Sequence, residues 1–379
     1  MKRTLFSLLV ALVSVIQSRA AGAAAVSPEV HADRTVTLRI TAPKAADVTL
    51  ICDWLDGAQK LTKADDGTWS ITLGPLAPST YIYSFNVDGV ATTDPVNPRI
   101  KLRARGAASL VEVPSESPGV QEVCDVPHGT VEVNWQKSSI LGETRRLLVY
   151  TPPGYTADTA SRYPVLLLLH GSNDTSDGWT SVGNVNFIAD NLIAEKKMMP
   201  MVIVMPNFYS LSPGHGGTGN ATFYKYLLEE VLPMIESKYR IAAGRENRAV
   251  AGMSLGANQS LDLFFNHFDL FSSVGAFSAA SYGQLETAHA AFLADPKGTN
   301  AKIGVFWIGC GRQDPTHFDG SQRVGEVLAA HQINHVWRPT EGMHNYALWR
   351  DYLAEFLPLL FQPGGSAAAA GSAEPPAVR

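Results

Sequence analysis

Apolar and polar positions follow two different patterns along the chain. From Val26 to Pro114 they alternate in short runs such as TVTLRITAP and STYIYSFNVDG, which proline, glycine and aspartate separate. Alternation with a period of two is typical of half-buried strands. Strands spaced about ten residues apart predict a small all-β sandwich of immunoglobulin-like type over residues 26–114. Residues 115–125, SESPGVQEVCD, are the expected linker.

Residues 126–362 follow the second pattern. The runs VEVNWQKSS and RRLLVYTPPGY predict paired outer strands, and the unbroken apolar runs at Val165–Leu169 and Met201–Met205 predict strands buried on both faces. Further strands are expected around Ala249 and at 303–308 and 335–338. Helices are expected at 187–196, 223–235 with a kink at Pro233, 258–265, 322–331 and 347–360. Repeated strand–helix units predict an α/β domain with a mostly parallel sheet and helices on both faces.

The two ends of the chain carry other signals. Lys2 and Arg3 precede an apolar run, Leu5–Ile16, and small residues follow it. This order predicts a signal peptide over residues 1–23, cleaved near Ala21 or Ala23. The apolar run is too short for a membrane span. We therefore expect a secreted protein, periplasmic or extracellular. Residues 363–379 are low in complexity and are expected to be disordered.

Charge and cysteine content narrow the classes of partner. The formal net charge is −5 and no basic run occurs, so neither a nucleic acid nor a membrane partner is expected. Three cysteines cannot all pair: Cys310 lies in an apolar run and is predicted to be a buried thiol, and a Cys52–Cys124 bridge stays open. The sequence holds no CxxC, HExxH or Cys/His cluster, so we expect no metal and no other cofactor.

The stretch from Asn247 to Asn266, NRAVAGMSLGANQSLDLFFN, carries the first chemical signal. A short apolar strand, a G-x-S-x-G turn and a helix follow one another, which is the context of a nucleophile elbow that exposes Ser254 at the sheet edge. Gly252 and Gly256 lack a Cβ where strand and helix pass closely. The N–H of Leu255, at the helix N-terminus, is a candidate oxyanion donor. The alternative is that Ser254 only caps the helix.

A serine hydroxyl becomes a nucleophile only when an imidazole takes its proton and an acid orients that imidazole. In α/β-hydrolases the acid and then the histidine follow the serine along the chain. His344 lies in EGMHN, between the last expected strand and helix, and is the candidate base. Asp314 ends the run VFWIGCGRQD and is the candidate acid, with Glu341 as its rival and a plain turn aspartate as the alternative. Three other histidines lie well downstream of the serine, in the region that could close the site, namely His317, His331 and His335.

The loop HGSN after the strand Val165–Leu169 is the expected source of a second oxyanion donor, which is the N–H of Gly171 or of Ser172. His170 is expected to be structural. Aromatic side chains are the candidates for contact with substrate, although core packing explains them equally well. They are Trp179 as one wall of the pocket and Phe208, Tyr209, Tyr346 and Trp349 as a slot for a phenolic ring.

Several of these segments together carry a resemblance. YPVLLLLHGSNDTSDGW, RAVAGMSLGANQSL, FWIGCGRQD and EGMHNYALWRDYL look, in this order, like the feruloyl and acetylxylan esterases of carbohydrate esterase family 1. The resemblance covers nearly all of residues 126–361 and implies an α/β-hydrolase fold. In that family the elbow serine, the aspartate after the glycine-rich turn and the late-loop histidine form the triad, which implies Ser254, Asp314 and His344 here. The preceding sandwich resembles the early-set immunoglobulin-like domain found ahead of such esterases.

The resemblance implies a cofactor-free serine esterase that removes feruloyl or acetyl groups from plant cell-wall polysaccharide or oligosaccharide. Two departures leave the acyl preference open: the elbow, usually S-M-G-G, is Ser254-Leu255-Gly256-Ala257, and the histidine loop, usually G-G-H-T-W, reads G-M-H-N-Y at 342–346. Two alternatives stay open. One is a siderophore esterase of the enterochelin type, and the other is a non-catalytic carbohydrate-binding protein on a hydrolase scaffold.

Overall fold

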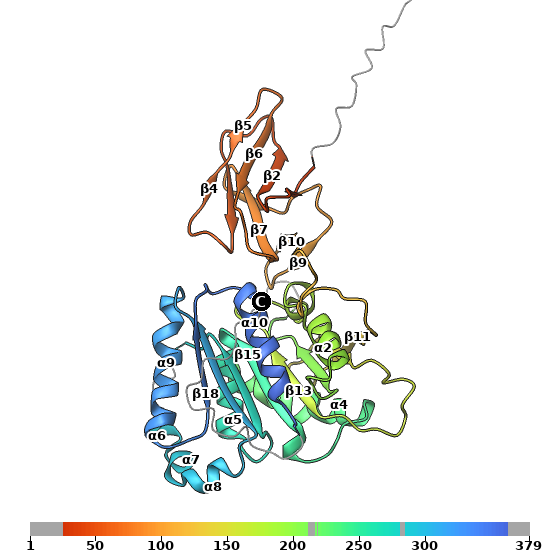
Figure 1. Ribbon diagram of the computed structural model, residues 1–379, viewed down its shortest axis with the longest axis vertical. Helices are drawn as coiled ribbons and strands as arrows, with labels where there is room; N and C mark the ends of the chain where they lie inside the picture. Colours follow the sequence, from red (N-terminus) through yellow and green to blue (C-terminus); the bar gives the residue numbers. More distant parts are fainter. Residues whose placement is uncertain (1–25, 211–216, 218, 281–284, 363–379) are drawn as a thin grey trace, which may run out of the picture.

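The computed structural model of the protein describes residues 26–210, 217, 219–280 and 285–362. The expected signal peptide and the expected disordered tail lie outside these ranges. Figure 1 shows two parts along the long axis: a group of N-terminal strands lies above a larger domain of strands and helices. Of the helices in the described ranges, none has the length and apolarity that a membrane crossing requires.

The N-terminal β region, residues 26–114, consists of two antiparallel sheets. One has the order β1 (Glu29–Val30), β2 (Val36–Thr41), β6 (Thr68–Leu73) and β5 (Thr62–Lys63). The other has the order β4 (Gln59–Lys60), β3 (Val48–Cys52), β7 (Ser79–Val87), β10 (Ala107–Val113) and β9 (Ile100–Leu102), and β8 (Val90–Thr92) also pairs with β7. Trp69, Tyr81 and Tyr83 are buried in the core of this region, so these aromatic side chains pack its interior.

The α/β domain is built on one eight-stranded sheet. Its strands in spatial order are β11 (Thr130–Lys137), β12 (Thr144–Thr151), β14 (Val202–Pro206), β13 (Val165–Leu169), β15 (Arg248–Met253), β16 (Ser273–Phe277), β17 (Val305–Gly311) and β18 (Val336–Thr340). The β11–β12 and β12–β14 pairs are antiparallel and the remaining pairs are parallel. The predicted fold class is therefore confirmed, with N-terminal β-sheets followed by an α/β-hydrolase-like domain.

Helices cover both faces of this sheet. Along β13, Val165, Leu167 and Leu169 belong to one buried cluster and Leu166 and Leu168 to another, as the unbroken apolar run predicts. The first cluster includes residues of α3 (Asn220–Tyr226), α4 (Leu232–Lys238), α5 (Leu255–Asn266) and α9 (Pro315–Ala330). The second includes residues of α1 (Gly178–Ser181), α2 (Val185–Ala194) and α10 (Tyr346–Phe356). The short helices α6 (Leu285–Ala288), α7 (Ala290–Ala294) and α8 (Pro296–Asn300) follow β16.

Some sequence-based expectations differ from the structure. Strand β16, SVGAF, was not predicted, because its small residues give a weak apolar signal. Helix α9 begins at Pro315, seven residues before the expected start. A π-helical turn, Leu227–Val231, directly precedes the helix that holds Pro233, where we expected a kink. Cys52 and Cys124 are both free thiols, so the bridge left open does not form, whereas Cys310 is buried as predicted.

Candidate active site

Ser254 occupies a strained turn between β15 and α5. Its backbone has φ 56° and ψ −120°, a conformation that non-glycine residues rarely adopt. A Cβ on Gly252 would lie 2.6 Å from the backbone carbon of Gly256, and a Cβ on Gly256 would lie 2.6 Å from the oxygen of Leu169. The two glycines therefore permit the close approach that raises Ser254 at the strand end. The Ser254 side chain makes no capping hydrogen bond, so the helix-cap alternative is wrong.

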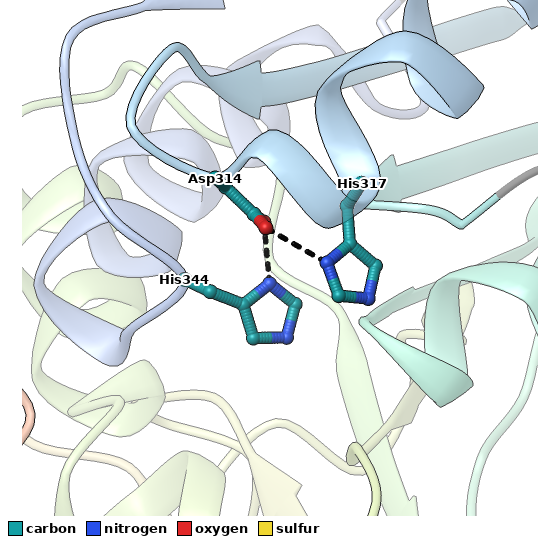
Figure 2. Close-up of side chains that lie close together, drawn as sticks. All are labelled: Asp314, His317 and His344. Atoms are coloured by element: carbon teal, nitrogen blue, oxygen red, sulfur yellow. Dashed lines mark hydrogen bonds and ion pairs between the residues drawn. The ribbon is translucent and has the colours of Figure 1, made fainter.

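Three distant side chains meet at this turn. His344 Nε2 lies 3.0 Å from Ser254 Oγ, and His344 Nδ1 lies 2.5 Å from Asp314 Oδ2. Figure 2 shows the contact between His344 and Asp314, with His344 in the loop before α10 and Asp314 at the start of α9. An imidazole with an acid on one nitrogen and a hydroxyl on the other is the arrangement that relays a serine proton.

Asp314 is the acid that this geometry selects. Its side chain is 3% exposed, whereas that of the rival Glu341 is 74% exposed and contacts Arg312 and Gln313. Burial alone would raise the pKa of Asp314, but hydrogen bonds from His317 and His344 outweigh burial and hold that pKa well below its usual range. Asp314 is therefore an anion at neutral pH, as the partner of a histidine base must be.

His317 is a residue of the site that sequence reasoning did not assign. Its Nδ1 lies 2.8 Å from Asp314 Oδ1, so both oxygens of the carboxylate bind an imidazole (Figure 2). Its ring stacks on that of His344, with centroids 4.0 Å apart and planes 16° apart. The available signal was the spacing of three from Asp314 at a helix start, which places both side chains on one helix face.

Asp314, His317 and His344 also form a group whose potential metal-ligand atoms lie within 4.8 Å of one another. Two imidazoles and a carboxylate are a ligand set that suits Zn²⁺. The sequence contained no motif for such a group, because its members come from α9 and from the loop before α10. The Nδ1 atoms of both histidines and both carboxylate oxygens of Asp314 already take part in hydrogen bonds within the group.

Two backbone segments provide candidate oxyanion donors. Leu255 is the first residue of α5, so its N–H has no acceptor within the helix. Gly171 lies against the elbow, because a Cβ there would approach Met253 Sδ to 2.6 Å and Ser254 Cβ to 3.2 Å. Ser172, next to it, is exposed. The structure thus places Gly171 of the HGSN loop beside Ser254.

His170 has the structural role expected of it. It is 2% exposed, its Nε2 accepts the Phe208 N–H at 3.0 Å, and its Nδ1 lies 2.9 Å from the Gly171 oxygen. Burial lowers the pKa of His170, which favours the neutral ring that these contacts require. His170 therefore fixes the loop that holds the candidate oxyanion donors. His331 and His335 make no contact with Ser254 among the hydrogen bonds of the described residues, and burial lowers the pKa of His335.

A family model described as "Putative esterase" matches residues 138–360. The chain belongs to this esterase family. The match covers the elbow, Asp314 and His344, and it begins after the N-terminal β region.

Curated relatives of this chain carry the names of different ester hydrolases. An endo-1,4-beta-xylanase/feruloyl esterase from Xylanibacter ruminicola is 28% identical over 347 residues, which cover 88% of this chain and 46% of that protein. An iron(III) enterobactin esterase from Escherichia coli is 24% identical over 284 residues, which cover 72% of this chain and 68% of that protein. The chain spans less than half the length of several curated relatives that it matches.

Solved structures show the same two groups. A CE1 ferulic acid esterase from Anaeromyces mucronatus, in complex with ferulic acid, has a TM-score of 0.54 at 26% identity and covers 62% of this chain and 92% of that chain. The enterobactin esterase from Shigella flexneri has a TM-score of 0.65 at 19% identity and covers 87% of this chain and 93% of that chain. The second similarity is one of fold, and it extends over the N-terminal β region.

Most of the aromatic side chains predicted to contact substrate are buried in this member of the esterase family. Trp179 is 0% exposed and donates its indole N–H to the Leu169 oxygen at 3.0 Å, so it forms core and not a pocket wall. Tyr346 is 2% exposed and donates to Asp174, which likewise contradicts a place in an open slot. Phe208 and Trp349 are also buried. Tyr209 is the one of the predicted set that is partly exposed, and its hydroxyl accepts the Asn173 N–H at 3.1 Å.

Proposed function

We propose that this protein is a serine esterase in which Ser254 is the nucleophile, His344 the general base and Asp314 the residue that orients His344. The observation that carries the proposal is the pair of contacts at His344, 3.0 Å to Ser254 Oγ and 2.5 Å to Asp314 Oδ2, on a strained elbow. The sequence match to an esterase family supports it. Filled triad positions in hydrogen-bonding geometry disfavour a non-catalytic carbohydrate-binding protein.

In the proposed mechanism, Ser254 Oγ attacks the ester carbonyl carbon while its proton passes to His344 Nε2. The negative charge on the carbonyl oxygen is stabilised by the N–H of Leu255 and by that of Gly171 or Ser172. Cleavage of the carbon–oxygen bond then releases the alcohol, which takes the proton from His344. Water attacks the acyl-enzyme in the same manner and releases the acid. No cofactor takes part in these steps.

The proposed substrates are feruloyl or acetyl esters on plant cell-wall polysaccharide such as xylan. Two comparisons support this choice, the name of the Xylanibacter ruminicola relative and the ferulic acid complex of the Anaeromyces mucronatus enzyme. The burial of Phe208, Tyr346 and Trp349 leaves Tyr209 as the aromatic residue of the predicted set that can face a phenolic ring. Export, proposed from residues 1–23, would bring the enzyme to such a polymer.

The second candidate function is hydrolysis of a catecholate siderophore such as enterobactin. The observation in its favour is coverage, because the Shigella flexneri structure matches 87% of this chain, including the N-terminal β region, whereas the Anaeromyces mucronatus structure covers 62%.

Initial rates on methyl ferulate, acetylated xylan, p-nitrophenyl acetate and enterobactin separate the candidates. We expect hydrolysis of p-nitrophenyl acetate and of at least one of the first two substrates, with enterobactin left intact. Preferential hydrolysis of enterobactin would instead assign the siderophore activity. A folded wild-type protein that hydrolyses none of the four would contradict the proposed function itself.

A further inference from the structure

The N-terminal β region and the α/β domain share one apolar core. Ile82, Ala108 and Leu110 of the β region belong to the same buried cluster as Leu166 of β13 and Trp349 of α10. Figure 1 shows the N-terminal strands above the helices of the larger domain, and contacts of β7 with α10 and of β9 with α1 join the two parts. Such continuity is typical of one folded unit, not of a module on a tether.

A buried ion pair crosses this junction. Lys101, on β9, has a side chain that is 4% exposed, and its ammonium contacts a carboxylate oxygen of Asp174, which is 6% exposed. The same ammonium lies 5.5 Å from the centre of the Tyr346 ring. The other carboxylate oxygen of Asp174 accepts the Tyr346 hydroxyl at 2.7 Å. Lys101, Asp174 and Tyr346, the junction network, therefore join three separate segments of the chain.

Two of these segments carry the proposed catalytic groups. Asp174 stands three residues after Gly171, in the loop of the candidate oxyanion donor, and Tyr346 stands two residues after His344. Packing at the network is tight, because a Cβ on Gly178 would lie 2.2 Å from the Tyr346 hydroxyl and 2.6 Å from Asp174 Oδ1. A displacement of either partner would thus move a loop of the active site.

Two further hydrogen bonds connect the β region to the same two loops. The Ala104 N–H donates to the Asn173 oxygen at 3.3 Å, next to Asp174. The Asn345 side-chain amide donates to the Asp53 oxygen at 3.0 Å, between His344 and Tyr346. Each loop is therefore held from the β region by a backbone contact as well as through the junction network.

We propose that Lys101 is a positioning residue for the esterase reaction: it fixes Asp174 and Tyr346, and through them the distance between the oxyanion loop and His344. The N-terminal β region is thereby part of the catalytic apparatus and not a separable binding module. This inference rests on the proposed esterase function. A buried carboxylate and a buried ammonium stabilise each other. Removal of one leaves the other buried without a partner, which disorders the junction unless the second charge is removed as well.

The test compares full-length variants. Lys101→Met removes the ammonium, Lys101→Met/Asp174→Asn also removes the stranded carboxylate, and Tyr346→Phe removes only the hydroxyl. Arg99→Met is the matched control, since Arg99 lies two residues from Lys101 but forms an ion pair with Glu112 that is 48% and 37% exposed. The kcat and KM for p-nitrophenyl acetate and the midpoint of thermal unfolding are measured for each variant.

We expect the double variant to unfold near the wild-type temperature with a kcat reduced about tenfold or more and KM changed less than about twofold, since small displacements of catalytic groups reduce kcat strongly. Tyr346→Phe should lower kcat in the same sense, and Arg99→Met should leave both constants unchanged. A wild-type kcat in Tyr346→Phe and in a folded double variant would overturn the inference. If the double variant does not fold, the kcat of Tyr346→Phe decides, and a wild-type value there overturns the inference. An inactive wild-type protein would refute the proposed function instead.

Discussion

His317 provides the most specific prediction of the site, because the structure separates its two contacts. One is the hydrogen bond from Nδ1 to Asp314 Oδ1 at 2.8 Å, and the other is the stacking of its ring on His344 at 4.0 Å. His317→Phe keeps an aromatic ring in that position and removes the hydrogen bond. His317→Asn keeps a donor and removes the ring. The two variants therefore assign any effect to one contact or to the other.

The expected size of the effect follows from the burial of Asp314. Its side chain is 3% exposed, so the oxygen that loses His317 gains little from water. A hydrogen bond to a charged group contributes about 1.5–3 kcal/mol to stability, and we expect His317→Phe to lose that amount. The pKa of Asp314 rises, because one of the two hydrogen bonds that lower it is gone. If the whole of this free energy were also lost from the transition state, kcat would fall about 10- to 160-fold, which is the upper limit.

Urea unfolding followed by tryptophan fluorescence and initial rates with p-nitrophenyl acetate measure these two effects. We predict that His317→Phe is less stable and slower than wild type, and that His317→Asn stays closer to wild type in both respects. The same stability and the same kcat in His317→Phe as in wild type would refute the view that His317 supports Asp314.

Two further predictions concern the junction and the elbow. Burial raises the pKa of Asp53 from 3.8 to about 7, so the folded protein holds a proton that the unfolded chain releases, and stability falls as the pH rises through this window. At about 1.4 kcal/mol per pKa unit, this shift makes the free energy of unfolding depend on pH by up to about 4 kcal/mol, and Asp53→Asn should remove that dependence. Equal slopes of unfolding free energy against pH in variant and wild type would contradict this. Gly256→Ala, whose Cβ would meet backbone oxygens at 2.6 Å, should cost about 1–3 kcal/mol. Its control is Gly325→Ala in α9, where the nearest atoms lie at 3.6 Å and stability should not fall, and equal stability of the two would argue against the close approach.

Ser254, Asp314 and His344 are far apart in the sequence, but each could be predicted because its own neighbouring residues identify it. The elbow needs glycines at fixed offsets from Ser254. Asp314 follows a run of apolar residues at a strand end, and His344 lies in the loop after the last strand. Parallel sheets collect functional groups at these strand ends. The same reasoning applied to β13, whose five apolar residues predicted burial on both faces. It failed for β16, because serine, glycine and alanine give a short strand no distinctive pattern.

Side-chain exposure was the part that sequence could not provide. Trp179 and Tyr346 were expected at the pocket, but their burial depends on Asp174, Leu169 and the N-terminal β region, which come from elsewhere in the chain. His317 was named among the downstream histidines without a role, because its stacking partner is distant in sequence. Contacts of this kind depend on which elements pack together, and apolar periodicity does not specify that.

The central claim is that Ser254 forms the acyl-enzyme. Its most direct test is a reaction of wild type and Ser254→Ala with a fluorophosphonate, which reacts covalently with activated serines, followed by peptide mass spectrometry. We predict one adduct per wild-type chain, on the peptide that contains Ser254, and neither adduct nor ester hydrolysis in the folded Ser254→Ala variant. An adduct on a different serine, or undiminished hydrolysis of p-nitrophenyl acetate by Ser254→Ala, would contradict the account.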